Sequence, residues 1–238
     1  MMIENTNKPV CVIVGVGPGN GAAFACQFGA NGYQVALLAR SLEFTTVLAK
    51  EINDTKAYVC DVADAASVAH TFTAIRAEMG DIDTLIFNPG AGVWKSVEEI
   101  TAEEFEQSWR VNALGALLVS QQVLPSMKAN KRGNIIFIGA TASRRGGAKT
   151  AAFAPAKAAQ RSLAESMARH LGAAGIHVAT VIVDAVVDTS ATRKMMPNKP
   201  DAFFLQPEDL AEVVFDLTQQ KPSAWSSEIE VRPFGEIW

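Results

Sequence analysis

Short apolar runs alternate along this chain with longer segments in which apolar residues recur at helical spacing. The runs that we expect to be strands cover residues 10–14, 34–39, 58–60, 84–87, 134–138, 177–183 and 228–231. Some of them, such as residues 135–138, are apolar at every position, which is typical of parallel strands covered on both faces. The alternation predicts an α/β fold: a single doubly wound domain with about seven parallel strands, helices on both faces and right-handed crossovers.

The segments between these runs carry the start and stop signals of helices. We expect helices over residues 21–30, 42–51, 63–79, 102–129, 152–171 and 207–218. Thr101 and Glu104 form a capping box before the fourth of these, and Pro207 suits a first helical turn. The 238 residues contain no internal repeat and no break in composition, so we expect one domain over residues 1–238.

A glycine-rich turn follows the first expected strand and opens the first helix; its sequence is GVGPGNG, residues 15–21. Glycines let the backbone turn sharply and approach a diphosphate, and the helix N-terminus stabilises the negative charge of that group. A turn that only joins a strand to a helix would have a similar sequence. The strand–turn–helix setting favours dinucleotide binding, which makes the expected domain a Rossmann-type fold.

The second expected strand ends without the acidic residue that usually selects NAD(H). An Asp or Glu about 20 residues after the turn would hydrogen-bond the ribose 2′-hydroxyl, but the chain has Ala39 followed by Arg40 and Ser41. A guanidinium and a hydroxyl suit a 2′-phosphate, because Arg forms charge-assisted bidentate bonds with it. We therefore predict NADP(H) rather than NAD(H) as the cofactor; a solvated Arg at a strand end is the alternative.

Composition and charge exclude several other classes of protein. The formal net charge is −4 and no run of Lys or Arg is longer than a pair, so we expect no nucleic-acid partner. No stretch reaches the ~18 consecutive apolar residues of a membrane span, and residues 1–9 lack the apolar core of a secretory signal. We expect a cytoplasmic protein.

The three cysteines, Cys11, Cys26 and Cys60, lack metal-ligand spacing and have apolar neighbours. We therefore interpret them as reduced core thiols and expect no metal site.

Over nearly its whole length the chain resembles the short-chain dehydrogenase/reductase family. Four of the family's motifs recur in the same order: Gly-x-x-x-Gly-x-Gly on Gly15, Gly19 and Gly21, Asp-Val on Asp61-Val62, Asn-Ala-Gly on Asn88-Pro89-Gly90, and the Asn of a long helix on Asn112. The resemblance implies that the cofactor contacts are Gly15, Gly19, Asn20, Gly21, Arg40, Ser41, Asp61, Val62, Asn88, Gly90, Lys157, Val187 and Thr189.

The catalytic centre departs from the family's pattern. The family's Tyr-x-x-x-Lys falls on Phe153 and Lys157, and its Ser falls on Ala140. In the family, the Tyr gives a proton to the substrate oxygen while hydride reaches carbon, and the Ser holds that oxygen. Phe153 has no proton to give and Ala140 has no hydrogen bond to give. We expect the usual proton transfer to be impaired, since general acid catalysis is typically worth ~10²–10⁴ in rate.

Other residues near this centre are candidates to replace the lost hydroxyls. Thr141 and Ser143 lie close in sequence to the family's Ser and are candidate hydrogen-bond partners of the substrate, although ordinary loop chemistry also explains them. Asp184 stands where the family shows Pro after the sixth strand, and a desolvated carboxyl there could act as the acid; a turn or cap role is the alternative. The full set of candidate catalytic residues is Asn112, Thr141, Ser143, Phe153, Lys157 and Asp184.

Residues 190–205 fall where the family places its substrate lid. Met195, Met196, Phe203 and Phe204 either line an apolar pocket or pack as a cover over the end of the sheet, and the sequence leaves both interpretations open.

The resemblance further implies a homodimer or homotetramer built from the helices that contain Asn112 and Lys157, where small residues such as Ala113 and Ala158 would permit close packing. Two functional hypotheses follow. The first is an NAD(P)(H)-dependent oxidoreductase that transfers hydride to or from a small carbonyl, alcohol or activated double bond, with an atypical proton-transfer site. The second is a non-catalytic dinucleotide-binding sensor or partner subunit. Both predict cofactor binding, and only the first predicts turnover of a small-molecule substrate.

Overall fold

Seven parallel strands form one central sheet in the order β3-β2-β1-β4-β5-β6-β9. Their bounds are β1 (Val10–Val14), β2 (Gln34–Ala39), β3 (Thr55–Val59), β4 (Ile82–Phe87), β5 (Gly133–Ala140), β6 (Ile176–Val183) and β9 (Glu228–Val231). The computed structural model describes residues 8–90 and 92–235. Most of the segment considered as a secretory signal therefore lies outside the described residues. Every neighbouring pair of strands in this sheet is parallel, so the predicted α/β fold is confirmed.

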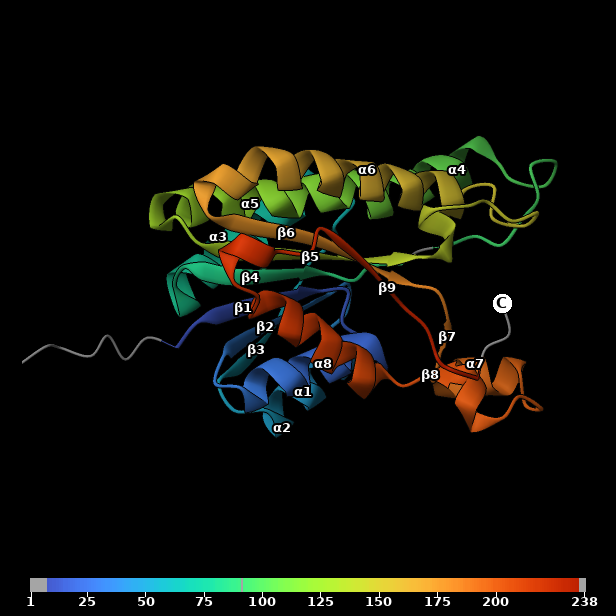
Figure 1. Ribbon diagram of the computed structural model, residues 1–238, viewed down its shortest axis with the longest axis horizontal. Coiled ribbons are helices and arrows are strands. Elements are labelled where there is room, and N and C mark those ends of the chain that lie inside the picture. Colours follow the sequence, from blue (N-terminus) through green and yellow to red (C-terminus); the bar gives the residue numbers. More distant parts are fainter. Residues whose placement is uncertain (1–7, 91, 236–238) are drawn as a thin grey trace, which may run out of the picture.

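Helices cover both faces of this sheet (Figure 1). On one face lie α3 (Ala65–Met79), α5 (Gly115–Asn130) and α6 (Phe153–Leu171). On the other lie α1 (Asn20–Ala30), α2 (Glu43–Glu51) and α8 (Pro207–Thr218). α4 (Ala102–Trp109) precedes α5, and α7 (Ser190–Met195) lies beyond the end of the sheet.

The strands direct alternate side chains into two buried clusters. In β1, Val10, Val12 and Val14 pack on the side of α3, α5 and α6, whereas Cys11 and Ile13 pack on the side of α1 and α8. Successive side chains of a strand point to opposite faces of the sheet. A strand covered on both faces must therefore be apolar at every position, which is the physical origin of the continuous apolar runs.

Several elements differ in extent from the expected ones, and two of the differences have a structural reason. β3 begins at Thr55 rather than at residue 58, because it is an edge strand that pairs only with β2 and leaves some of its residues exposed. The segment 102–129, expected as one helix, is divided by a π-helical turn at Arg110–Leu114 between α4 and α5. A π turn replaces i→i+4 by i→i+5 bonds within a continuous helical stretch, and an expectation based on overall helical spacing does not resolve such a single turn.

The segment that falls where the family places its substrate lid contains regular structure. β7 (Val186–Val187) pairs in parallel with β8 (Phe204–Leu205), and α7 lies between them in sequence. Phe204 is buried, with the Arg193 guanidinium 4.1 Å from its ring centre, whereas Met195 is exposed. Phe203 meets Phe204 edge-on. The two phenylalanines thus pack against each other, and Phe204 also lines a cavity with Leu205 and Val231, so these contacts do not separate the two interpretations.

Cys26 contradicts the expectation that all three cysteines are core thiols. Cys11 and Cys60 are buried, but Cys26 is exposed on α1, whose buried side carries Phe24 and Phe28. Burial raises the pKa of the Cys11 thiol well above its usual value.

The two alanines assigned to a subunit interface also differ from one another. Ala113 is buried in the chain's own interior, so of these two alanines only the exposed Ala158 could pack closely against a second chain.

Within the described residues, no helix is long and apolar enough to cross a membrane.

The glycine turn joins three strands at their carboxyl ends. Gly15 has a φ of +79°, and its N–H and that of Val16 donate to the Leu38 carbonyl of β2 at 2.9 and 3.0 Å. Asn88, which follows β4, donates from Nδ2 to the Gly15 carbonyl at 2.9 Å. A Cβ at Gly15 would lie 2.9 Å from the backbone nitrogen of Pro89. Both the backbone conformation and the available space therefore require glycine.

We expect Gly15→Ala to destabilise the protein more than Gly32→Ala, although both glycines have a positive φ. A Cβ at Gly32 would meet no atom within 4 Å, so only the left-handed backbone penalty of about 1–2 kcal/mol applies. Gly15→Ala adds an overlap with Pro89, for a total of about 2–4 kcal/mol. Urea unfolding of both variants measures the difference, and equal losses of unfolding free energy would contradict the prediction.

Candidate functional site

Two adjoining cavities open at the carboxyl edge of the sheet. The first, which we call the turn pocket, has a volume of about 470 Å³ and lies beside the glycine turn. The second, the apolar pocket, has a volume of about 510 Å³ and lies beside the start of α6. Asn20, Asn88, Gly90 and Val187 line both cavities. Ligands of doubly wound sheets bind at this edge, where the strand order reverses between β1 and β4.

The turn pocket brings together most of the residues predicted to contact a dinucleotide. Those that line it are Gly15, Asn20, Gly21, Arg40, Asp61, Val62, Asn88, Gly90, Val187 and Thr189. Three predicted residues are placed elsewhere. Gly19 does not line the turn pocket, and a Cβ there would lie 3.0 Å from the Thr189 methyl group. Ser41 is exposed outside the turn pocket, and Lys157 lines the apolar pocket.

The start of α1 makes the turn pocket suitable for a negatively charged ligand. α1 begins without a capping side chain and without an acidic residue in its first turn, so the partial positive charge of its N-terminus is not neutralised locally. The Oδ1 atom of Asn20 is buried and has no hydrogen-bond partner among the described residues. A buried acceptor of this kind costs about 1–3 kcal/mol unless a donor reaches it. The residues present therefore fit a diphosphate with neighbouring hydroxyl or amide donors.

Two charged residues lie at the rim of the turn pocket. Arg40 is exposed at the end of β2, and its guanidinium makes no ion pair or hydrogen bond with any described residue. Asp61 is held in place, since its Oδ1 accepts a hydrogen bond from the Ala63 N–H at 3.0 Å and its N–H donates to Ser67 at 3.0 Å. A guanidinium without a partner among the described residues thus stands where the sequence predicts a 2′-phosphate.

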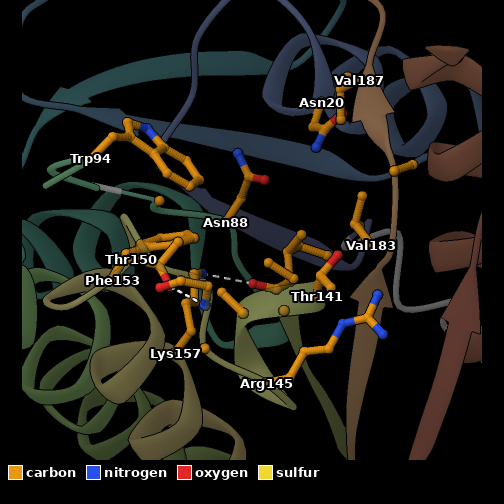
Figure 2. A pocket seen from close by; sticks show the side chains of 18 residues that line it. Asn20, Asn88, Trp94, Thr141, Arg145, Thr150, Phe153, Lys157, Val183 and Val187 are labelled. Carbon is orange, nitrogen blue, oxygen red and sulfur yellow. Dashed lines mark hydrogen bonds between the residues drawn. The ribbon is translucent and has the colours of Figure 1, made fainter. Parts of the chain in front are cut away.

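An aromatic pair forms one wall of the apolar pocket (Figure 2). The rings of Trp94 and Phe153 lie 5.5 Å apart between centres. Phe153 is the first residue of α6 and packs with Ala140, Ala142 and Ala154 in a small apolar cluster. The two positions where the resembling family has hydroxyl groups are therefore both occupied by apolar side chains in this cavity.

Lys157 lies deep in the apolar pocket and is only 3% exposed. Its Nζ donates to the carbonyl oxygens of Pro89 and Ile138 and to Oε1 of Gln160, each at 2.9 Å. Burial lowers the pKa of Lys157 to about 7. The sequence analysis missed Gln160, although a polar residue three positions after a lysine on the buried face of a helix is a signal that could have found it.

Asn112 lies in the π-helical turn and is fully buried. Its Nδ2 donates to the Ser108 carbonyl at 2.8 Å, and Ser108 in turn donates to the Ala152 carbonyl at the start of α6. Asn112 is not among the residues that line either pocket. Its direct role in chemistry stays a prediction, while its position supports the contact between α4 and α6.

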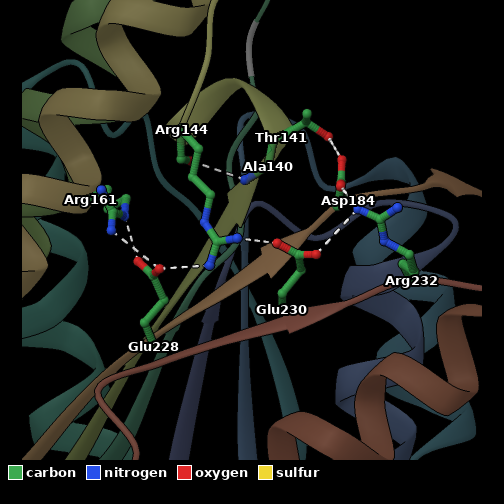
Figure 3. Close-up of polar contacts among 9 residues, drawn as sticks. Ala140, Thr141, Arg144, Arg161, Asp184, Glu228, Glu230 and Arg232 are labelled. Carbon is green, nitrogen blue, oxygen red and sulfur yellow. Dashed lines mark hydrogen bonds and ion pairs between the residues drawn. The ribbon is translucent and has the colours of Figure 1, made fainter. Parts of the chain in front are cut away.

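Of the candidates to replace the lost hydroxyls, Thr141 alone lines the apolar pocket. Its Oγ1 donates a hydrogen bond to Asp184, whose other carboxylate oxygen pairs with Arg232 (Figure 3). Ser143 is buried, with its Oγ accepting a hydrogen bond from the Ala140 N–H at 3.1 Å. Neither Ser143 nor Asp184 lines the apolar pocket. Hydrogen bonds hold their side chains to Ala140, Thr141 and Arg232, and a catalytic role for either residue stays a prediction.

Ion pairs of alternating charge hold the loop after β5 against β9 (Figure 3). Arg161 of α6 pairs with Glu228, Glu228 also pairs with Arg144 at 2.8 Å, and Arg144 pairs with Glu230. Arg232 then joins Glu230 to Asp184. Networks of this kind contribute more than isolated surface pairs, because each side chain is fixed by two partners. The segment that carries Thr141 is thus anchored to the edge of the sheet.

Comparisons with known proteins agree with this arrangement. Residues 9–200 match the short chain dehydrogenase family. The 3-oxoacyl-[acyl-carrier-protein] reductase MabA of Mycobacterium bovis is 32% identical over 184 residues, which cover 77% of this chain and 71% of that protein. A metagenomic short-chain oxidoreductase solved in complex with NADP is 28% identical, with a TM-score of 0.84 over 96% of this chain and 98% of that one. An alcohol dehydrogenase from the archaeon Thermococcus sibiricus, complexed with 5-hydroxy-NADP, is 26% identical, with a TM-score of 0.86 and the same coverage of 96% and 98%.

Lys157 is expected to make the stability of the protein rise with pH. Its folded pKa of about 7 is below the value of ~10.4 in an unfolded chain. Between these pH values the unfolded state binds more protons, so the unfolding free energy rises by up to ~1.4 kcal/mol per pH unit. The buried Cys11 thiol has the opposite effect on the pH dependence of stability.

The quantity to measure is therefore the difference in unfolding free energy between the wild type and Lys157→Met at each pH. As the pH rises, this difference should change in favour of the wild type. The exposed Lys149 supplies the control, Lys149→Met, and a pH-independent difference for Lys157→Met would contradict the prediction.

Proposed function

The chain belongs to the short-chain dehydrogenase/reductase family, and we propose that it is an oxidoreductase that binds NADP(H) in preference to NAD(H). The observation that carries the proposal is the turn pocket, where the glycine turn, the uncapped start of α1 and the free Arg40 guanidinium surround one cavity. The related structures with NADP or 5-hydroxy-NADP support the same cofactor. A homodimer or homotetramer remains a prediction.

We assign the parts of the cofactor to this chain's own residues. The N-terminus of α1 and the glycine turn would hold the diphosphate, Arg40 the 2′-phosphate, and Asp61 with Val62 the adenine side. Val187 and Asn20 line both cavities, so they mark the passage toward the apolar pocket. When bound there, the nicotinamide ring would supply or accept a hydride.

The apolar pocket determines which substrates suit this chemistry. Phe153 and Ala140 offer no proton, and the Thr141 hydroxyl already donates to Asp184. Lys157 makes its hydrogen bonds to the protein rather than to a neighbouring hydroxyl. A substrate that needs no proton from an enzymic acid, such as an iminium ion or an activated double bond, therefore fits these walls better than a simple ketone.

A non-catalytic dinucleotide sensor is the second candidate, favoured by one observation. Phe153 closes against Trp94 where the family has a hydroxyl, so the pocket could hold a nicotinamide without completing a reaction. The two functions differ in single-turnover experiments with bound NADPH and a panel of iminium, activated-alkene and carbonyl compounds. Oxidation of the cofactor by any of these compounds supports the enzyme, and cofactor binding without any oxidation supports the sensor.

Arg40→Ala is expected to remove the preference for NADP(H). Loss of a charge-assisted hydrogen bond costs about 1.5–3 kcal/mol, so the affinity for NADPH should fall about 10–100-fold while that for NADH changes little. Calorimetric titration with both cofactors measures the ratio. Lys56→Ala, which removes an exposed cation of β3 outside the turn pocket, is the control. An unchanged ratio in Arg40→Ala would reject the 2′-phosphate assignment.

Restoring both hydroxyls, with Phe153→Tyr and Ala140→Ser, is expected to confer carbonyl reduction. A positioned acid and an oxyanion donor are each worth about 10² or more in rate, so the double variant should reduce a simple ketone at least ~10²-fold faster than the wild type. Phe153→Leu with Ala140→Ser is the matched control, because it changes the same positions without adding a phenol. If the double variant binds NADPH and gains nothing, the pocket differs from the family beyond these two positions.

A further inference from the structure

We propose that the apolar pocket takes a substrate with a carboxylate on an apolar or aromatic body, and that Arg145 binds the carboxylate. The inference deepens the proposed function, on which it rests for the use of this cavity by the substrate. It concerns the class of molecule that the walls recognise rather than the hydride transfer itself.

Two adjacent arginines in the loop after β5 have different surroundings. The guanidinium of Arg144 pairs with Glu228 and Glu230 of β9. Arg145 lines the apolar pocket and is exposed, and its guanidinium forms no ion pair or hydrogen bond with any described residue. Arg145 therefore keeps all its side-chain donors for a ligand, and its planar fork matches the two oxygens of a carboxylate.

The charge of the pocket selects an anion. Among the described residues, its lining contains no Asp or Glu, and the two cationic residues there are Arg145 and Lys157. Lys157 is buried and makes three hydrogen bonds within the protein. Arg145 is thus the cation that is available to bind a ligand. The surrounding apolar walls strengthen the attraction between its guanidinium and an anion relative to the same attraction in open water.

The aromatic pair supplies the surface for the rest of the molecule. Trp94 is 64% exposed and stands over Phe153. Figure 2 shows these rings on one side of the pocket and Arg145, with Thr141 and Val183, on the other. A ligand that spans the cavity would place its apolar body against the rings and its anionic group at Arg145. The volume of about 510 Å³ suits a small organic molecule of this kind.

The backbone of Arg145 is held in place before any ligand arrives. The N–H groups of Arg144 and Arg145 donate to the Thr141 carbonyl at 3.0 and 3.2 Å. The ion pairs of Arg144 anchor the same turn to β9 (Figure 3). Less conformational entropy is therefore lost when the Arg145 side chain binds an anion than if the whole loop were free.

Calorimetric titration of the full chain with 2-naphthoate and 2-naphthamide tests the proposal, because the two probes share an apolar body and differ in charge. We expect 2-naphthoate to bind about tenfold more tightly than 2-naphthamide at low salt, and the preference to shrink at high salt. Arg145→Gln should abolish the preference and Arg145→Lys should retain part of it. Lys149→Gln, which removes one positive charge from the same loop outside the pocket, should leave it unchanged.

Three results would overturn the proposal: equal affinities of the two probes, a preference that survives Arg145→Gln, or no binding of either probe at ~1 mM. Arg145 is exposed and its side chain has no partner among the described residues, so its replacement leaves the folded state intact, which thermal unfolding checks. NADPH affinity, measured on the same samples, separates the two levels of inference. In the wild type, equal affinities for the two probes with NADPH binding intact reject the carboxylate site alone, whereas absence of NADPH binding rejects the proposed function.

Discussion

The hydrogen bonds that close the glycine turn are the constraint on which both pockets depend. Gly15 and Val16 donate to the carbonyl of Leu38, and Asn88 donates to the carbonyl of Gly15. These bonds tie the ends of β2, β1 and β4 together at the point where the strand order reverses. All parallel strands end at this edge, so the residues that follow them converge on the turn. Arg40 and the other wall residues reach one cavity for this reason.

The apolar pocket combines a buried lysine with walls that, among the described residues, carry no carboxyl group and no phenol. A buried cation is tolerated only with hydrogen-bond partners, and Lys157 has them in Pro89, Ile138 and Gln160. These contacts connect α6 to the ends of β4 and β5. The lysine therefore links these elements at the junction between the two cavities independently of any part in chemistry, and its burial lowers its pKa to about 7.

Some charged residues around the apolar pocket form ion pairs that hold the structure, and one is available to bind a ligand. Along β9, alternating ion pairs use Arg161, Glu228, Arg144 and Glu230 to fix the loop after β5. Arg145, the next residue in that loop, lines the cavity and has no acidic partner among the described residues. The carboxylates of β9 thus neutralise the arginine that faces the sheet and leave the one that faces the cavity available. Arg144 and Arg145 thus differ in function because one is paired with the carboxylates of β9 and the other lines the cavity.

The sequence by itself determined the fold class and the location of the turn pocket, because these depend on local patterns. Continuous apolar runs specify strands covered on both faces, and the glycines of residues 15–21 specify a turn between β1 and α1. Only the tertiary structure decided which polar side chains face a cavity. Ser143 and Asp184 are next in sequence to residues that line the apolar pocket, but their side chains are held by hydrogen bonds to Ala140, Thr141 and Arg232. Arg232 is 48 residues from Asp184, and no local pattern encodes a contact between residues so far apart.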